Sequence, residues 1–131
     1  MSTDTLVVLV TAPSADQAAS LGRTLVGERL AACGNVVPGL RSIYRWEGKV
    51  QDEPEALLVL KTTRARFAAL RERALDLHPY DVPEVLALPV EAGSAAYLEW
   101  IARETATPRG RPAPSARPSA ARRGASRPRR G

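Results

Sequence analysis

The chain has 131 residues, of which 44% are hydrophobic, and it carries a net charge of +5. This length and composition fit one compact domain with a modest core. No apolar run reaches the length of a membrane span, and the first residues lack the basic-then-apolar order of a signal peptide, so we expect no membrane contact. A single cysteine cannot form an internal disulfide, and a cytoplasmic location is therefore expected.

The positive charge is confined to the end of the chain. Residues 1–105 hold 11 Lys and Arg against 14 Asp and Glu, which gives −3, whereas residues 106–131 hold eight Arg and no acid, which gives +8. The second segment contains no large apolar side chain, so it cannot bury enough apolar area to fold. We predict a folded domain over 1–105 and a disordered Arg/Pro/Ala-rich tail over 106–131. The tail either makes weak, non-specific contact with nucleic acid or is a solubilising or vestigial extension.

The first two predicted elements are a strand and a helix. The apolar run 6–10 is typical of a central strand. Ser14 and Gln17 form a capping-box pattern, which predicts a helix beginning at about residue 15. Apolar residues then recur at helical spacing, so the helix is expected to continue to about residue 30 or 32.

A long two-stranded ribbon is predicted over residues 33–63. Alternation places Tyr44 and Trp46 on one face of its first strand. Glu47-Gly48 supplies the turn, because glycine adopts the positive φ that a tight hairpin needs. A two-stranded ribbon is marginally stable in water, and one small domain cannot cover its aromatic tip, so we expect other subunits to cover it.

The returning strand carries the continuous apolar run 57–60, which is typical of a strand buried on both faces. Pro54 lies before this run and cannot donate a hydrogen bond to the ladder. It is therefore expected to mark a bulge or an unpaired edge.

The remaining residues predict a second helix, a fourth strand and a short third helix. The second helix has an apolar stripe and ends at His78-Pro79, because the residue before proline avoids the helical region. The strand spans 85–90, and the last helix begins near Ser94. The order β-α-β-β-α-β-α predicts an α+β fold, the ferredoxin-like sandwich, with two helices on one sheet face. The other face is expected to be either solvated or covered by the terminal helix and neighbouring chains.

Cys33 and His78 are the residues of this chain that suit soft or borderline metals. One of each cannot form a closed four-ligand site within a single chain. The alternative is that Cys33 is a small buried apolar residue at the junction of helix and ribbon.

The loop from His78 to Glu84 presents His, Tyr, Asp and Glu between two prolines, which suits binding or proton transfer. The alternative for this loop is a helix stop followed by an edge strand, with Glu84 paired to a nearby basic residue.

Glu55 and Lys61 share one face of the returning strand with apolar residues between them. They are either solvent-facing strand ends or the lining of a cleft between subunits. Tyr44 and Trp46 indicate an interface, because base stacking would need positive charge on the same face and the neighbouring Arg45 points the other way. No phosphate loop, nucleophile elbow or Ser-His-Asp order is visible, so an enzyme is not expected.

Five segments of the chain resemble the CutA divalent-cation tolerance proteins. The resemblance runs from about Thr5 to Arg103 in the expected order and spacing, and the tail lies outside it. The segments are Ala32-Cys33-Gly34-Asn35-Val36-Val37-Pro38, Ser42-Ile43-Tyr44-Arg45-Trp46-Glu47-Gly48-Lys49, Glu55, Lys61-Thr62 and His78-Pro79-Tyr80-Asp81-Val82-Pro83-Glu84.

This resemblance implies a stable homotrimer whose ribbons pack between subunits, and it implies binding of copper or other divalent cations in metal tolerance. Some relatives carry several cysteines, and the single cysteine here argues against a multi-thiolate copper site. The alternative is a trimeric module, similar to the PII signalling proteins, that binds a small anionic molecule between subunits. The candidate metal ligands are Cys33, His78 and Glu84; the candidate cleft residues are Trp46, Glu55, Lys61 and Tyr80; and the candidate interface residues are Tyr44 and Trp46.

Overall fold

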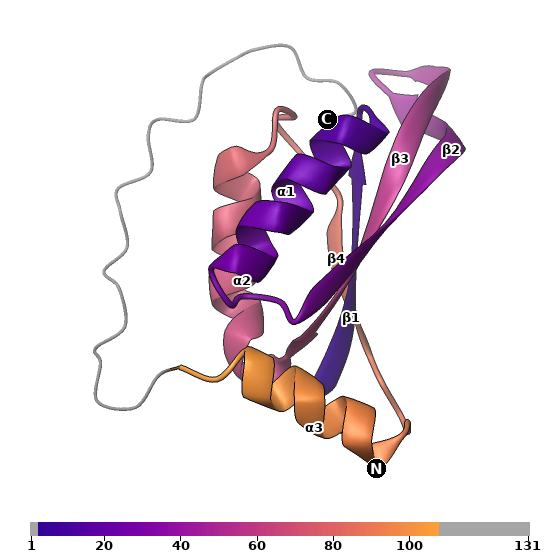
Figure 1. Cartoon of the computed structure of the whole chain (residues 1–131). Helices are drawn as coiled ribbons and strands as arrows, with labels where there is room; N and C mark the ends of the chain where they lie inside the picture. Colours follow the sequence, from indigo (N-terminus) through magenta and orange to yellow (C-terminus); the bar gives the residue numbers. More distant parts are fainter. Residues whose placement is uncertain (1–2, 108–131) are drawn as a thin grey trace.

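The computed structural model describes residues 3–107, which form an α+β fold with one sheet (Figure 1). Its elements follow the predicted order, and the α+β class is confirmed. Of the predicted tail, residues 108–131 lie outside the described part of the chain. The elements are β1 (Thr5–Ala12), α1 (Ala15–Gly27), β2 (Cys33–Trp46), β3 (Lys49–Thr63), α2 (Arg64–Leu77), β4 (Val85–Pro89) and α3 (Ala95–Glu104).

The four strands form one antiparallel sheet in the order β2-β3-β1-β4, which is the ferredoxin-like arrangement. The helices α1 and α2 lie together on one side of this sheet, whereas α3 lies across its lower end (Figure 1). Because successive strand residues point to opposite faces, each strand gives one set of side chains to the helices and one to the other face. We call the face turned away from α1 and α2 the open face.

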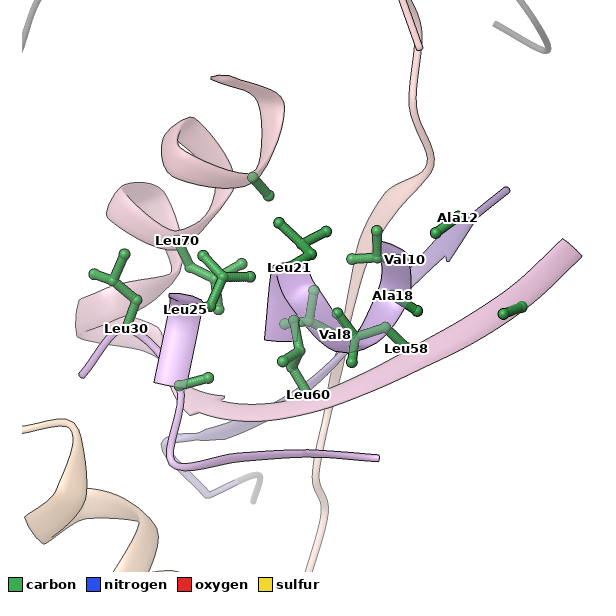
Figure 2. Close-up of a cluster of buried hydrophobic side chains, with 13 residues drawn as sticks. Val8, Val10, Ala12, Ala18, Leu21, Leu25, Leu30, Leu58, Leu60 and Leu70 are labelled. Carbon is green, nitrogen blue, oxygen red and sulfur yellow. The ribbon is translucent and has the colours of Figure 1, made fainter. Parts of the chain in front are cut away.

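The core lies between the helices and their face of the sheet (Figure 2). Val8 and Leu58 come from adjacent strands, while Leu25 and Leu70 come from the two helices, and all four are fully buried. Close approach of α1 and β2 to this core needs small residues, since a Cβ at Gly22 would lie 3.1 Å from a methyl group of Leu58. Burial of apolar side chains of this kind is the main source of stability in a small domain.

The helix α1 begins as predicted but ends earlier. Ser14 is its N-cap, and the side-chain oxygen of Ser14 accepts a hydrogen bond from the backbone N–H of Gln17 at 3.1 Å. The helix ends at Gly27, so the prediction of an end at residue 30 or 32 was wrong. Arg29 takes a left-handed conformation with φ 63°, which stops the helix even though the apolar pattern continues through Leu30.

The ribbon formed by β2 and β3 has the predicted turn, with positive φ at both Glu47 (50°) and Gly48 (79°). Its bulge, however, lies on the strand opposite the predicted one. Pairing shifts between Val37 and Leu40 in β2, where Gly39 has φ 81°, while Pro54 stays in register with Arg41. The prediction that Pro54 marks a bulge was therefore wrong. The alternative of an unpaired edge is confirmed, because β1 pairs only with residues 56–63 of β3 among the described residues.

Within residues 3–107, no helix is both long enough and apolar enough to cross a membrane.

Candidate metal and ligand sites

Cys33 is the first residue of β2 and lies directly opposite Lys61 of β3. Its neighbour Gly34 faces Leu60 in the core, so the Cys33 side chain belongs to the open face. There it meets α3: the Cys33 Sγ lies 3.4 Å from the hydroxyl oxygen of Tyr97. This hydrogen bond, together with partial burial, raises the pKa of the Tyr97 phenol. The cysteine is half-buried rather than sealed in the core.

Lys61 lies on the same face, because residues directly opposite each other in a ladder share a face. Its ammonium donates a hydrogen bond of 2.5 Å to Asn35 Oδ1, two residues along β2 from Cys33. A thiol and an ammonium group thus sit side by side at the end of the sheet covered by α3. An arrangement of this kind suits either a soft cation on the sulfur or an anion near the ammonium.

His78 follows the last residue of α2 and is buried. One ring nitrogen, Nδ1, accepts a hydrogen bond from the backbone N–H of Tyr80 at 3.1 Å, so it carries no proton. The other nitrogen, Nε2, therefore donates to the carbonyl oxygen of Thr11 at 2.8 Å. Both nitrogens are engaged with the backbone, and a metal ion would have to displace one of these partners.

Glu55 and Tyr80 form a buried pair at the base of the ribbon. They are only 3% and 6% exposed, and the Tyr80 hydroxyl donates to Glu55 Oε2 at 2.5 Å. The Tyr80 ring also lies 4.6 Å, centroid to centroid, from the ring of His78. The structure thus brings together three of the residues singled out in the sequence, from β3 and from the loop before β4.

The aromatic residues of the ribbon share a face with Glu55. Tyr44 donates from its hydroxyl to Glu53 Oε1 at 2.9 Å, while Trp46 pairs with Lys49 beside the turn. Both aromatic side chains are half-buried, whereas Ile43 and Arg45 between them are exposed. The predicted alternation along this strand is confirmed.

The described residues of a single chain do not bring Cys33 and His78 to one metal site. Cys33 lies in register with Lys61, which pairs with Val7, whereas His78 binds Thr11, four residues farther along β1. Four residues of strand span about 13 Å, too far for both side chains to bind one ion. Glu84 is half-buried just before β4. Among residues 3–107, no group of three or more His, Cys, Asp or Glu side chains is placed to hold a metal.

Two residues of these sites were missed from the sequence. Tyr97 was placed only in the terminal helix, yet it is the side chain that contacts Cys33. Asn35 was noted only as part of the ribbon, yet it holds the Lys61 ammonium. Period-2 alternation from Cys33 would have placed Asn35 beside Lys61, but no sequence pattern gives the packing of Tyr97.

Fold and site together define a class of protein: a ferredoxin-like domain with an extended β2-β3 ribbon and a single thiol at the end of its open face. A family model described as CutA1 divalent ion tolerance protein matches residues 6–104. The chain therefore belongs to the CutA1 family, as the resemblance of its segments predicted.

Individual relatives agree with this assignment. The chain is similar to the divalent-cation tolerance protein CutA of Thermus thermophilus, with 52% identity over 99 residues, 76% of this chain and 96% of that protein. It is 48% identical to the chloroplastic protein CutA of Arabidopsis thaliana, over 76% of this chain and 55% of the plant protein. The crystal structure of CutA from Xylella fastidiosa matches with a TM-score of 0.77 and 39% identity, over 79% of this chain and 100% of that one.

Proposed function

We propose that this protein is a homotrimeric, non-enzymatic protein that binds copper or another divalent cation in metal tolerance, and that it acts in the cytoplasm. The observation that carries the proposal is the match of residues 6–104 to the divalent ion tolerance family. The relatives from Thermus thermophilus and Escherichia coli bear the name divalent-cation tolerance protein. A soft donor in this chain, Cys33, gives the proposal a chemical basis.

The open face supports self-association. Leu86 and Leu88 of β4 are 55% and 48% exposed on it, next to the half-buried Val7 and Leu9 of β1. Apolar residues contiguous over two strands form a surface that monomers seldom leave in water. A ring of three copies, with Tyr44 and Trp46 at the contacts, covers such a face and leaves no free ribbon edge. Light scattering at micromolar concentration should report three chains, and a monomer would refute this part of the proposal.

Copper binding depends on Cys33 in this proposal. A thiolate suits Cu(I), whereas His78 and Glu84 suit Cu(II) or zinc. Since the donors of one protomer lie apart, the remaining ligands come from water, the backbone or a second subunit. Cys33 already contacts the Tyr97 hydroxyl, and the metal has to displace that contact.

A competition titration with a Cu(I) chelator tests this site. Cys33→Ser should lose Cu(I) binding while keeping the trimer, and Tyr97→Phe is the matched control, because it removes the hydroxyl partner and leaves the thiol. Cu(I) held by Cys33→Ser as tightly as by the parent would show that the cysteine serves only in packing.

The second candidate function is binding of a small anion between subunits, and the position of the half-buried Lys61 opposite Cys33 favours it. Its test is a thermal-shift screen of anionic metabolites, repeated with Lys61→Gln. Stabilisation that Lys61→Gln abolishes and Cys33→Ser retains would favour this function over metal binding.

In this proposal the tail adds nucleic acid as a partner to either function. Its eight Arg and no acid support weak, non-specific nucleic-acid contact, which three tails in a trimer would strengthen by avidity. Neutralising the tail should abolish salt-sensitive retention on DNA.

A further inference from the structure

The end of α1, the start of α2 and the end of α3 lie close together (Figure 1). Three exposed or half-exposed arginines from this region contact one another through the backbone. Arg29 donates from Nη2 to the carbonyl oxygen of Arg103 at 2.9 Å, and Arg66 donates from Nε to the carbonyl oxygen of Arg29 at 3.4 Å. Arg64 also lies on the first turn of α2, but its guanidinium turns to the other side of the helix, where Nε donates to the carbonyl oxygen of Thr3 at 3.3 Å. We call these four residues the arginine cluster.

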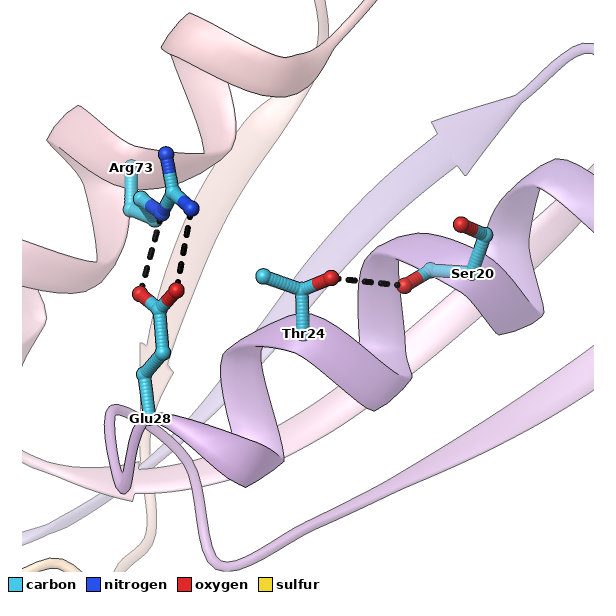
Figure 3. A network of polar contacts seen from close by, with 4 residues as sticks. All are labelled: Ser20, Thr24, Glu28 and Arg73. Carbon is cyan, nitrogen blue, oxygen red and sulfur yellow. Dashed lines mark hydrogen bonds and ion pairs between the residues drawn. The ribbon is translucent and has the colours of Figure 1, made fainter.

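Two acidic residues adjoin the cluster in sequence, Glu28 beside Arg29 and Glu104 beside Arg103. Over residues 3–107, none of the four arginines forms a salt bridge. Glu28, the acid next to Arg29 in sequence, is engaged elsewhere: both its oxygens accept hydrogen bonds of 2.9 Å from Arg73 (Figure 3). The cluster therefore presents cationic groups with free hydrogen-bond capacity.

The guanidinium N–H groups of the arginine cluster that make no protein contact suit phosphate. Arg64 and Arg66 use only Nε on backbone carbonyls, at 3.3 and 3.4 Å, which anchors each guanidinium and leaves its two terminal nitrogens for a ligand. The first turn of α2 contains no acidic residue, so the positive end of the helix dipole adds to the charge instead of being neutralised. Anchored guanidiniums of this kind bind phosphate groups in the bidentate manner that lysine cannot match.

The arginine-rich tail begins at this cluster. The backbone N–H of Ala106 donates to the carbonyl of Arg103 at 3.3 Å, the same carbonyl that accepts from Arg29. The chain thus leaves α3 in contact with the cluster, and the following residues add eight Arg without an acid. The tail therefore follows directly in sequence on the helix that contributes Arg103 to the cluster.

We propose that the arginine cluster is a docking surface for the phosphate backbone of nucleic acid, to which the tail adds charge. This goes beyond metal tolerance and rests in part on the proposed tail contact. Nucleic acid is favoured over an anionic membrane, because cluster and tail contain arginine and no lysine, and the tail offers no large apolar side chain for insertion. Since only phosphates are contacted, binding is independent of sequence and weakens with salt.

The test uses the full chain with a chelator present, so that it is independent of metal binding. Fluorescence anisotropy with a labelled duplex of about 20 base pairs is measured from about 50 to about 200 mM salt. The cluster variant carries Arg64→Gln, Arg66→Gln and Arg103→Gln, and Arg29 is left intact because it terminates α1. The matched control changes three exposed arginines outside the cluster, with Arg23→Gln, Arg45→Gln and Arg71→Gln. A third variant replaces the eight tail arginines by glutamine.

The cluster variant should lose about tenfold or more in affinity for the duplex. The slope of its log binding constant against log salt concentration should be smaller in magnitude by about 3 for each engaged protomer. The affinity of the control variant should change about twofold at most. Equal losses in cluster variant and control would overturn the proposal, as would absence of binding by the unchanged protein at low salt. Binding lost only in the tail variant would leave the tail contact standing and refute the cluster. Cluster-dependent binding to phosphatidylserine vesicles without binding to DNA would refute nucleic acid as the partner. Matching thermal unfolding of all four proteins confirms that each is folded.

Discussion

The two faces of the sheet are built from the same strands and end in opposite environments. On the helix-covered face, Val10 and Leu58 are fully buried under α1 and α2. On the open face, Leu57 and Leu9 are only half-buried, and Leu86 is more than half exposed. A strand with apolar residues on both faces is normally covered on both. One face is therefore completed by α1 and α2, whereas the other keeps partly exposed apolar side chains, which is the observation behind the proposed self-association.

The largest effects are expected when neighbouring leucines on opposite faces of the sheet are truncated. Leu58→Ala leaves a cavity beneath α1, and we expect it to lower the free energy of unfolding by about 2–5 kcal/mol. Leu57→Ala removes the same atoms from the open face, where packing within one protomer is incomplete. We expect the stability loss caused by Leu57→Ala to depend on protein concentration, because this side chain contributes to stability mainly through association of the chains.

Urea unfolding of both variants at two protein concentrations separates these effects. Leu58→Ala should shift the midpoint equally at both concentrations, relative to the unchanged protein. A smaller loss for Leu58→Ala than for Leu57→Ala would show that the helix-covered face is not the main core.

The second prediction places a charge on each side of the sheet. Leu86→Lys puts an ammonium on the open face, where association would have to bury it, so the dissociation constant of the assembly should rise by at least about 100-fold. Val50→Lys, on the other face of the ribbon and 68% exposed, is the control and should leave assembly unchanged. Analytical ultracentrifugation measures the dissociation constant of the assembly for both variants. Intact assembly of Leu86→Lys would exclude this face from the interface.

Sequence patterns predicted the strands, the helices and their order, because each element carries its own apolar periodicity. They failed where the backbone conformation of a single residue decides the outcome. The left-handed Arg29 ends α1 inside an apolar pattern that favours continuation, and the bulge falls at Gly39, not at the proline that the sequence marks more clearly. Residue type does not mark Arg29 as a helix stop, whereas Pro38-Gly39 is a dipeptide that does indicate a turn or bulge inside a strand.

For the candidate sites, the sequence predicted the position of each residue within its own strand or loop but not the contacts between elements. Alternation placed Glu55 and Lys61 on one face, and the loop of Tyr80 was recognised as rigid and polar. The contact of Tyr80 with Glu55 could not be predicted, because it joins residues 25 apart whose approach depends on the packing of the whole domain. The same holds for Cys33 and Tyr97, which are 64 residues apart.

The third prediction concerns the N-cap of α1, one of the two helices that cover the buried face of the sheet. Ser14→Ala removes the acceptor for the Gln17 N–H, and we expect a loss of about 1 kcal/mol in the free energy of unfolding. Ser42→Ala, on the ribbon, should change stability by less than about 0.5 kcal/mol. Thermal unfolding of the two variants measures the difference. Equal effects would mean that the cap contributes nothing beyond an ordinary surface hydroxyl.

The smallest expected effect concerns the exposed ion pair on the ribbon. Arg41 Nε lies 2.9 Å from Asp52 Oδ1, and the hydrogen bond from Arg41 lowers the pKa of the Asp52 carboxyl. A group whose pKa is lower in the folded state stabilises the fold above its unfolded pKa, about 3.9, and loses that contribution as the pH falls through the folded value. Asp52→Asn should therefore be slightly less stable than the unchanged protein at neutral pH, and the difference should vanish in acid. Urea midpoints at neutral pH and below about pH 3 check this. Because both side chains are exposed to solvent, the pair is screened, and a large or pH-independent difference would mean that Asp52 acts through a contact other than Arg41.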